Sequence, residues 1–253
     1  VNYNQREGLE TPNVDFGSLQ VKPKFNGNIA EVLWKTNTAQ GDHLRTYGYV
    51  YDKMNRLLAG FYQREDNPAG KKKNKKVDYD LNGNITHLKR SAFLESGNAT
   101  ASRIDDLTYN YNHPSPGNRL KSVTDSSTDY RGYPDVSGIT IDYDDNGNMT
   151  MQKDKGILQI DYNFLNLPNY LKFDRTYNPR FPGGDVNVKT TYLYRADGTK
   201  LRKLYTYGSG RANNETSTIT EYLDGFQYEV TDTGGRFSMT PKFAPTSEGY
   251  YNF

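Results

Sequence analysis

The residues best suited to chemistry lie in a short acidic segment in the middle of the chain. Asp142, Asp144 and Asn146-Gly147 match the first half of a calcium-binding loop, where oxygen ligands alternate along the chain and glycine occupies the sixth position. The twelfth position, which supplies a bidentate glutamate in such loops, is Lys153 here. Because a cation at that position would repel Ca²⁺, the pattern favours a hairpin turn over a calcium site.

The same two carboxylates could serve as the acid pair of a glycosidase. Acidic residues recur at the position after a tyrosine, however, as Asp52, Asp80 and Asp144. Recurrence favours a structural role in which the carboxylate accepts hydrogen bonds from the backbone of its own turn. We therefore expect no catalytic residues in this chain.

Other kinds of chemistry find little support. The three histidines, His43, His87 and His113, lie in unrelated contexts, and the chain has no cysteine. A metal site made by these histidines is not expected, and thiolate chemistry is excluded. No nucleophile elbow, phosphate-binding loop or dinucleotide fingerprint occurs, so no cofactor is expected.

The element that must position these acids is a β-hairpin at residues 139–152. Ile139, Ile141 and Tyr143 alternate with polar residues, which is typical of a strand with one apolar face. Asn146-Gly147 then predicts a tight turn, since both residue types tolerate positive φ. Met149 and Met151 resume the alternation on the return strand.

Weaker copies of this hairpin recur along the chain. Their anchor tyrosines are Tyr51, Tyr79, Tyr111, Tyr143, Tyr162 and Tyr194, so the steps between them are 28, 32, 32, 19 and 32 residues. Such periods indicate a repeat architecture, in which each unit buries its apolar face against its neighbours.

The repeat predicts a set of structural positions in strands and turns. These are Tyr49, Tyr51, Asp52, Arg56, Leu57, Tyr79, Asp80, Gly83, Tyr109, Tyr111, Tyr143, Asp144, Gly147, Tyr162, Tyr192, Tyr194, Gly198 and Gly225.

Composition indicates that tyrosine is the main packing residue. Hydrophobic residues make up 34% of the chain, aromatic residues 13%, and 22 residues are tyrosine. A tyrosine ring buries apolar area while its hydroxyl stays near water, which suits a thin sheet. Glycine and asparagine interrupt every stretch that could form a helix, so we expect an all-β fold.

The chain order predicts a polar lead-in over residues 1–24 and a single array of hairpins over residues 25–253. Trp34 is expected in the core or as a cap of the array. The lysine-rich run 71–76 and the polar segments 91–106 and 123–138 are expected to be surface loops. The net charge of +2 implies no basic face for nucleic acid, and no apolar run is long enough for a membrane span.

The Tyr-x-Tyr-Asp-x-x-x-Arg-Leu segment from Tyr49 to Leu57 and the Tyr-Asp-x-x-Gly-Asn pattern from Tyr143 to Asn148 resemble the YD-repeat, or Rhs, family. The variant resembles members from Bacteroidetes, as do the segments 222–228 and 245–251. The resemblance covers residues 25–253. Two departures stand out: Asn55 replaces the glycine that is usual in the family, and Asn112-His113-Pro114 follows Tyr111 in place of aspartate.

The resemblance implies a long, curved and twisted sheet of antiparallel hairpins that forms part of a hollow β-shell. Such shells enclose a C-terminal toxin or effector in large bacterial proteins that are secreted or attached to the cell surface. We expect the chain to be a fragment of the repeat region, truncated before the Rhs core, with any export signal outside it. Its partners would then be the rest of its own chain and the enclosed effector, and it would be a monomer or a weak edge-paired dimer.

Two other classes of function remain open at this point. Exposed tyrosines on a thin sheet could stack on sugar rings, which would make the chain a carbohydrate-binding module. The scattered acids and tyrosines could also belong to an enzyme that acts on polysaccharides.

Overall fold

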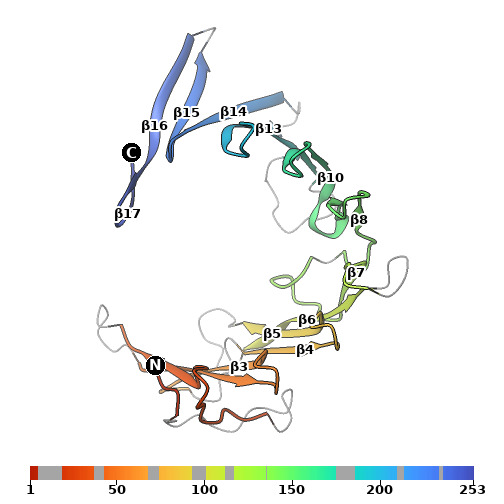
Figure 1. Cartoon of the computed structure of the whole chain (residues 1–253), viewed down its shortest axis with the longest axis vertical. Coiled ribbons are helices and arrows are strands. Elements are labelled where there is room, and N and C mark those ends of the chain that lie inside the picture. Colours follow the sequence, from red (N-terminus) through yellow and green to blue (C-terminus); the bar gives the residue numbers. More distant parts are fainter. Residues whose placement is uncertain are drawn as a thin grey trace. The chain divides into compact units, whose positions relative to one another are not determined.

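A computed structural model describes residues 1–4, 19–36, 43–67, 74–92, 101–111, 117–134, 136–174, 186–209, 214–233 and 236–253. The chain divides into two compact units, Val1–Gly138 and Ile139–Phe253. The described residues form β-strands and one short 3-10 turn, without an α-helix (Figure 1). The predicted all-β array of antiparallel hairpins is therefore confirmed.

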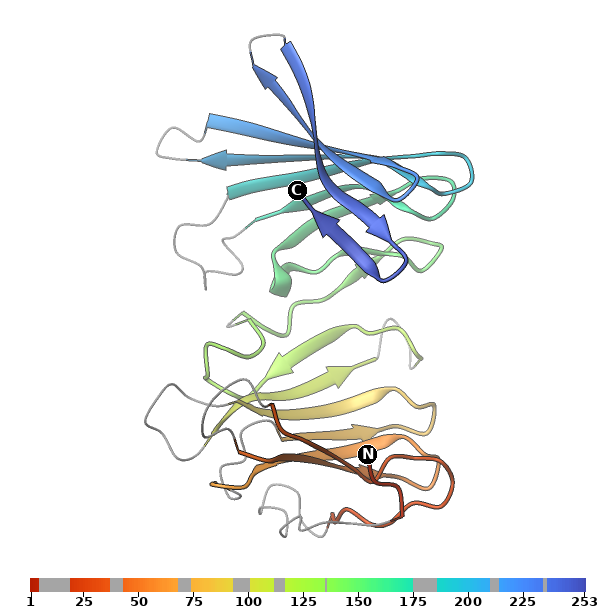
Figure 2. The ribbon, with the colours of Figure 1, turned by 90° about the vertical axis from the view of Figure 1, so that its left-hand side faces the viewer.

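The first unit contains a seven-stranded sheet within its described residues. Its strands pair in chain order, and every neighbour is antiparallel (Figure 2). The strands are β1 (Glu31–Trp34), β2 (Arg45–Tyr51), β3 (Leu57–Arg64), β4 (Lys75–Tyr79), β5 (Ile85–Ala92), β6 (Ser102–Asn110) and β7 (Ser122–Asp125).

The second unit begins with the predicted central hairpin, β8 (Asp142–Tyr143) and β9 (Met149–Met151). After the 3-10 turn η3 (Lys153–Lys155), an eight-stranded antiparallel sheet again follows chain order in the described ranges. Its strands are β10 (Ile157–Tyr162), β11 (Pro168–Phe173), β12 (Val186–Tyr194), β13 (Lys200–Ser209), β14 (Asn214–Leu223), β15 (Phe226–Thr233), β16 (Arg236–Thr246) and β17 (Gly249–Asn252).

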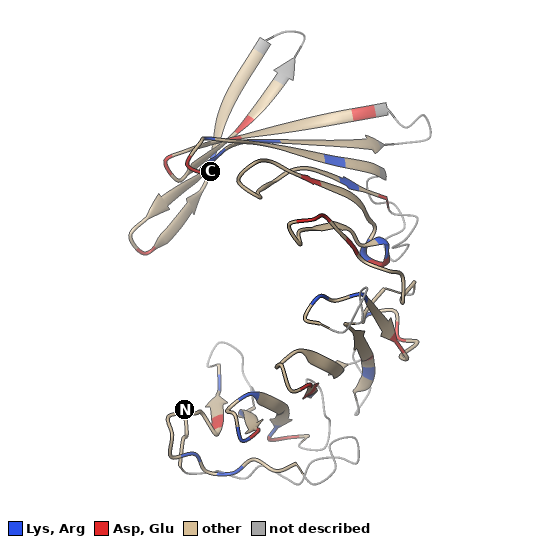
Figure 3. Ribbon diagram, turned by 45° about the vertical axis from the view of Figure 1, so that its right-hand side comes forward, with Lys and Arg blue, Asp and Glu red and all other residues tan. Residues whose placement is uncertain are grey.

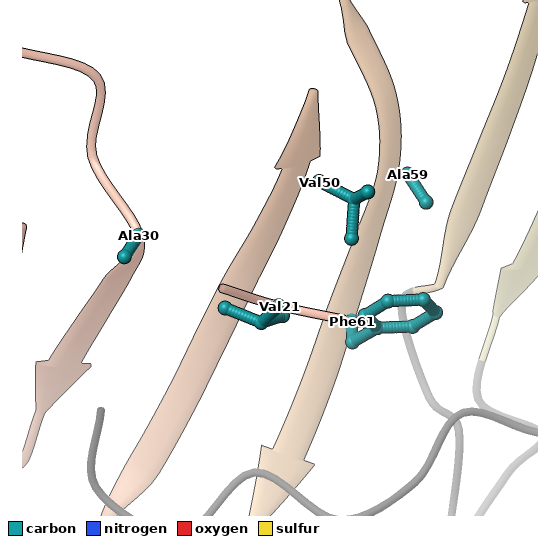
Figure 4. Packing of buried hydrophobic residues seen from close by; sticks show 5 residues of the cluster. All are labelled: Val21, Ala30, Val50, Ala59 and Phe61. Atoms are coloured by element: carbon teal, nitrogen blue, oxygen red, sulfur yellow. The ribbon is translucent and has the colours of Figure 1, made fainter. Parts of the chain in front are cut away.

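The hydrophobic core of the first unit includes a residue from the predicted lead-in. Val21 is only 3% exposed and packs with Ala30, Val50, Ala59 and Phe61 (Figure 4). Asn2 also bridges to Glu31 of β1, with backbone hydrogen bonds of 2.8 and 3.0 Å. The described ends of the lead-in are thus part of the folded unit. Val21 is stabilised there by burial of its apolar side chain, and the backbone of Asn2 is stabilised by its hydrogen bonds with the edge strand β1.

Three segments that were expected to be surface loops include strands. Residues 91–92 end β5, residues 102–106 belong to β6, where Ile104 and Asp105 are buried, and Val123 of β7 is 2% exposed. Lys75 and Lys76 of the lysine run lie in β4, while residues 71–73 fall outside the described part of the chain. Polar composition misled the prediction here, since a strand can bury a few apolar residues such as Ile104 and Val123 among polar ones, and a buried acid such as Asp105 can be held by hydrogen bonds.

Charges of both signs are interspersed along the described strands of each unit (Figure 3). Several lie in cross-strand pairs, such as Lys189 with Glu215 at 2.7 Å and Lys242 with Glu229 at 3.1 Å. Opposite charges on neighbouring strands stabilise the sheet modestly and keep its surface polar. Strand β13 by itself carries Lys200, Arg202 and Lys203 and no acid, but Glu221 of the neighbouring β14 pairs with Arg202.

Candidate functional site

The recurring feature of this protein is a hairpin turn that follows the anchor tyrosine. In five hairpins of the described chain, the residue after the tyrosine donates its amide to a carbonyl four residues later, at 2.8 to 3.0 Å. Its own carbonyl accepts the amide three residues later, at 2.9 to 3.2 Å. The first residues of these turns are Asp52, Asp80, Asp144, Asn163 and Arg195.

The fourth residue after each of these tyrosines has a left-handed backbone. The φ angles are 63° at Asn55, 91° at Gly83, 86° at Gly147, 57° at Asn166 and 87° at Gly198. Glycine adopts this conformation without steric cost, and asparagine tolerates it better than other residues do. Asn55 thus occupies the position that Gly83 and Gly147 occupy in their own turns.

The same irregularity of strand register occurs in all five turns. The anchor tyrosine pairs with the residue six positions later, and the residue before it pairs with the residue nine positions later, as in Tyr143 with Met149 and Asp142 with Met151. One residue on the return strand is left without a partner, which is a β-bulge after a left-handed turn residue.

The turn predicted at Asn146-Gly147 is present, and it spans more than these two residues. Only Gly147 has positive φ, and Asn146 lies within a longer turn closed by the amide of Gly147 on the carbonyl of Asp144, at 3.0 Å. A two-residue turn does occur later, at Asp224-Gly225, where both φ angles are positive, 46° and 89°, between the paired residues Leu223 and Phe226.

The aspartates at the start of the turns are held by hydrogen bonds within their own turns. Asp144 Oδ1 accepts the amide of Asn148 at 2.8 Å, and its Oδ2 accepts the side-chain amide of Asn148 at 2.9 Å. Asp80 and Asn84 make the same two contacts, both at 2.8 Å. The side-chain bonds from Asn148 and Asn84, together with backbone amides, lower the pKa of both carboxyl groups below the ordinary value.

Asp52 makes the corresponding contacts with Arg56. Its Oδ1 accepts the amides of Met54 and Arg56, both at 2.8 Å, and its Oδ2 accepts Arg56 Nε at 2.7 Å. Although desolvation opposes the shift, these bonds hold the pKa of Asp52 below its usual value. The carboxylates therefore act as acceptors for turn amides, in the arrangement expected of an Asx turn.

Three of the anchor tyrosines connect their hairpin to the one before it. The hydroxyl of Tyr79 donates to the carbonyl of Leu57 at 2.9 Å, that of Tyr162 to Met149 at 2.8 Å, and that of Tyr194 to Pro168 at 2.9 Å. Each acceptor lies six residues after the preceding anchor tyrosine. Burial raises the pKa of all three phenols above the ordinary value.

Asparagine side chains make a second connection between neighbouring turns. We call these contacts the asparagine bridges. Asn55 Oδ1 accepts hydrogen bonds from the side-chain amides of Asn26 at 2.7 Å and Asn28 at 3.1 Å. Asn166 Oδ1 accepts hydrogen bonds from the side-chain amides of Asn146 at 3.2 Å and Asn148 at 3.1 Å. Asn84 donates in the same way to Asn118 Oδ1, at 2.9 Å.

Other neighbouring turns meet through different side chains. Arg56 lies over the ring of Tyr79, 4.5 Å from its centroid, and donates to the carbonyl of Asp80 at 3.3 Å. Leu167 lies beside Gly198, and a Cβ added to Gly198 would be 3.4 Å from Cδ1 of Leu167. Within each unit, some pairs of neighbouring turns are thus joined by asparagine bridges and others by a cation–π contact or by apolar packing.

The remaining predicted positions lie on the strands. Tyr49 and Tyr51 have ring centroids 6.4 Å apart, and those of Tyr192 and Tyr194 are 6.1 Å apart. Tyr109 pairs with Val123, and burial raises its pKa. Tyr111 directly follows β6, and the residues after it, 112–116, lie outside the described part of the chain.

Trp34 is 38% exposed, and its ring lies 6.0 Å from that of Tyr62. Trp34 ends the edge strand β1, so it packs on the sheet of the first unit and is not part of the buried core.

The sequence reasoning missed a charged cluster in the first unit. Asp105 is 1% exposed, accepts Arg90 Nε, and accepts the amide of Tyr133 at 2.6 Å. Next to it, Asp129 accepts Ser102 Oγ at 2.8 Å and the Arg131 guanidinium at 2.6 Å. The bonds from Arg131 hold the pKa of Asp129 far below its usual range.

This cluster secures the segment after β7 against β6. Gly132 passes so close to the backbone of Ile104 that a side chain would overlap it. A buried carboxylate needs such partners, because an uncompensated charge in the interior is strongly destabilising. No spacing in the sequence indicated the cluster, since Ser102 and Arg131 are far apart along the chain.

The described residues hold no group of three or more His, Cys, Asp or Glu side chains arranged for a metal ion. In the same part of the chain, no helix has the length and hydrophobicity to cross a membrane. The side chain of Asp144, the strongest candidate for metal or acid chemistry, is already engaged in its own turn.

No family model matches the chain, and no curated protein matches its sequence. Among solved structures, it is similar to a chain of a Photorhabdus luminescens Tc holotoxin pore, at 14% identity with a TM-score of 0.35, over 76% of this chain and 11% of that chain. It is also similar to TcdB2-TccC3-TEV, at 15% identity with a TM-score of 0.36, over 81% of this chain and 12% of that chain. The chain thus spans about a tenth of the length of these proteins.

Proposed function

We propose that this chain is a non-catalytic structural segment of a larger protein of the YD-repeat, or Rhs, type. In this proposal, its hairpins form part of a β-shell that encloses a C-terminal effector of a secreted or surface-attached bacterial protein. Its partners are the rest of its own chain and that effector.

The observation that carries the proposal is the repeated hairpin geometry. The same turn bonds, left-handed residue and bulge recur at five places, and three anchor tyrosines reach back to the preceding hairpin. In these three cases the earlier hairpin supplies the carbonyl that holds the next one, so the same contact can be repeated as hairpins are added. Such an extendable sheet suits a wall better than a reaction centre.

The acids provide independent support for a non-catalytic role. Asp52, Asp80 and Asp144 use both carboxylate oxygens within their turns, and their pKa values are lowered. A general acid in a glycosidase needs a raised pKa and an oxygen directed at substrate. These groups have neither property.

The proposal is tested in the full-length natural protein by limited proteolysis, followed by mass mapping of the region downstream of residue 253. We expect that region to resist cleavage in the native protein and to be cleaved once Gly147→Val destabilises the central hairpin. Asp145→Val, in the same turn but at an ordinary φ, is the matched control and should leave the protection intact. Free cleavage of the downstream region in the native protein would overturn the proposed enclosure.

Carbohydrate binding is a second candidate function, supported by exposed aromatic rings on β16, on β17 and directly after β17. Phe237 is 71% exposed, Tyr250 62%, Tyr251 61% and Phe253 64%. Exposed aromatic faces can stack on sugar rings. A glycan array with the native chain and with Tyr251→Ala tests this candidate, and the absence of any glycan whose signal depends on Tyr251 would exclude this surface.

A further inference from the structure

Three turns of this protein carry the same local sequence, Asn-Gly-Asn, at residues 26–28, 82–84 and 146–148. An asparagine followed by glycine can cyclise, because glycine has no side chain to hinder attack by its own backbone nitrogen. The intrinsic chemistry is matched among the three sites, since the residue after each asparagine is the same. Any difference in their reactivity must then come from the fold.

The fold holds the attacking nitrogen differently in the three turns. The amide of Gly83 donates to the carbonyl of Asp80 at 3.2 Å, and that of Gly147 donates to the carbonyl of Asp144 at 3.0 Å. Within the described residues, the Gly27 amide makes no such bond. To attack, the nitrogen must lose its proton, and a hydrogen bond donated by that proton has to be broken first.

The surroundings of Gly27 also leave room for the reaction. Asn26 and Gly27 are both exposed, and a Cβ built on Gly27 meets nothing within 4 Å. The neighbouring Phe25 is 85% exposed. In addition, Asn26 Oδ1 accepts the amide of Asn28 at 3.2 Å, which polarises the carbonyl group that is attacked.

We propose that Asn26 is a site of spontaneous deamidation in the folded protein, and that it reacts faster than Asn82 and Asn146. Base removes the proton of the Gly27 amide, and the nitrogen attacks Cγ of Asn26. The new N–C bond closes a succinimide ring, and the side-chain nitrogen leaves as ammonia. Water then opens the ring at either carbonyl, which gives aspartate or isoaspartate.

Deamidation replaces a hydrogen-bond donor between two neighbouring turns with an acceptor. The Asn26 side-chain amide donates to Asn55 Oδ1 at 2.7 Å, and the carboxylate that replaces it is an acceptor only. Isoaspartate also inserts an extra carbon into the backbone next to the left-handed Gly27, whose φ is 86°. Deamidation therefore removes one of the two donors to Asn55 Oδ1, the other being the side-chain amide of Asn28 at 3.1 Å. The bridges to Asn118 and Asn166 do not involve Asn26.

The test is incubation of the folded chain in mildly alkaline buffer, with peptide mapping by mass spectrometry and chromatographic separation of isoaspartate. We expect Asn26 to react about fivefold faster than either other site. This factor corresponds to the free energy of the one hydrogen bond that the glycine amide must give up at Asn82 and at Asn146 before its nitrogen can attack. The same chain in denaturant is the control, and there the three sites should react at similar rates. Asn26→Gln keeps the amide but should abolish the product at this position, which verifies the assignment of the modified peptide.

Equal rates at the three sites in the folded chain would overturn the proposal, as would the absence of product at Asn26. A rate advantage of Asn26 that persists unchanged in denaturant would also overturn it, because the cause would then lie in the local sequence and not in the fold. These outcomes are independent of whether the chain forms part of a shell.

Discussion

At the scale of single residues, the anchor tyrosine combines two roles in one side chain. Its ring packs on the sheet, and its hydroxyl donates to a carbonyl of the preceding hairpin at 2.8 to 2.9 Å. A phenylalanine could supply the first role but not the second. This requirement explains why tyrosine, and not a more apolar residue, stands at positions 79, 162 and 194.

Replacing Tyr162 with Phe tests the value of the hydroxyl. The substitution keeps the ring but leaves the partly buried carbonyl of Met149 without its donor, so we expect a loss of about 0.5–1.5 kcal/mol in the free energy of unfolding. Tyr130→Phe is the control, since Tyr130 is 62% exposed, and it should be nearly neutral. Denaturant titration measures both variants, and equal effects would contradict the assigned role.

At the scale of the element, one left-handed residue closes each of the five described turns that follow an anchor tyrosine. Glycine and asparagine share this position, Gly83, Gly147 and Gly198 in three turns and Asn55 and Asn166 in the other two. Where asparagine stands there, its Oδ1 accepts side-chain amides of the preceding turn. The departure from glycine at Asn55 is thus accompanied by an additional polar contact between hairpins.

Replacing Gly147 with Val should destabilise the second unit by about 1–3 kcal/mol, because a β-branched residue is strained at φ 86°. Asp145→Val introduces the same side chain at an exposed position of the same turn, where φ is not positive. Its effect should stay within about 0.5 kcal/mol. Thermal or denaturant unfolding of the two variants measures the difference, and similar shifts would argue against the left-handed turn.

A double-mutant cycle measures the asparagine bridge between Asn146 and Asn166. Asn146→Ala removes a donor and Asn166→Gly removes the acceptor while keeping a residue suited to φ 57°. We expect a coupling free energy of about 0.5–1 kcal/mol, since the two side chains contact each other. Glu248→Ala combined with Asn166→Gly joins the turns at opposite ends of the eight-stranded sheet and should be additive. A cycle without coupling would show that the bridge contributes nothing to stability.

At the scale of the whole molecule, the described chain is held by antiparallel pairing between strands that are consecutive in the sequence. Helix is confined to the 3-10 turn η3 in the described residues. We therefore expect far-UV circular dichroism of the chain to show less than about a fifth helix, below the average for globular proteins. A larger helical signal would contradict the all-β architecture.

The tyrosines give the molecule a characteristic response to alkaline pH. Burial raises the pKa of several phenols above the ordinary value, to about 12 for Tyr47. The others are Tyr51, Tyr79, Tyr109, Tyr162, Tyr194 and Tyr222. A raised folded pKa means that these groups stabilise the fold fully below their unfolded pKa of about 10 and lose this contribution as pH rises through the folded values.

We therefore expect the ultraviolet titration of phenolate in the native chain to lie at higher pH than in the unfolded chain, with declining stability above about pH 10. Coincident titration curves for the native and unfolded chains would contradict the burial of these hydroxyls. For the turn aspartates, the dependence of stability on pH has the opposite sign. Their lowered pKa values stabilise the fold above the unfolded pKa, and this contribution is lost as pH falls through the folded values.

The sequence by itself determined the features that depend on neighbouring residues. Alternation around Tyr143 indicated a strand, and the recurrence of Asp52, Asp80 and Asp144 indicated carboxylates that accept backbone amides, because both effects act within a few residues. The turn type at Asn146-Gly147 was predicted less well, since a two-residue turn and a longer turn with a bulge both use glycine at positive φ.

Only the tertiary structure decided which residues of different hairpins meet. The acceptor of the Tyr162 hydroxyl, the bridge from Asn146 to Asn166, and the burial of Asp105 all depend on the register with which strands pair laterally. A shift of one residue would send each side chain to the opposite face of the sheet. The spacing of residues along one chain does not specify that register, which is set by the bulges and by packing between neighbouring hairpins.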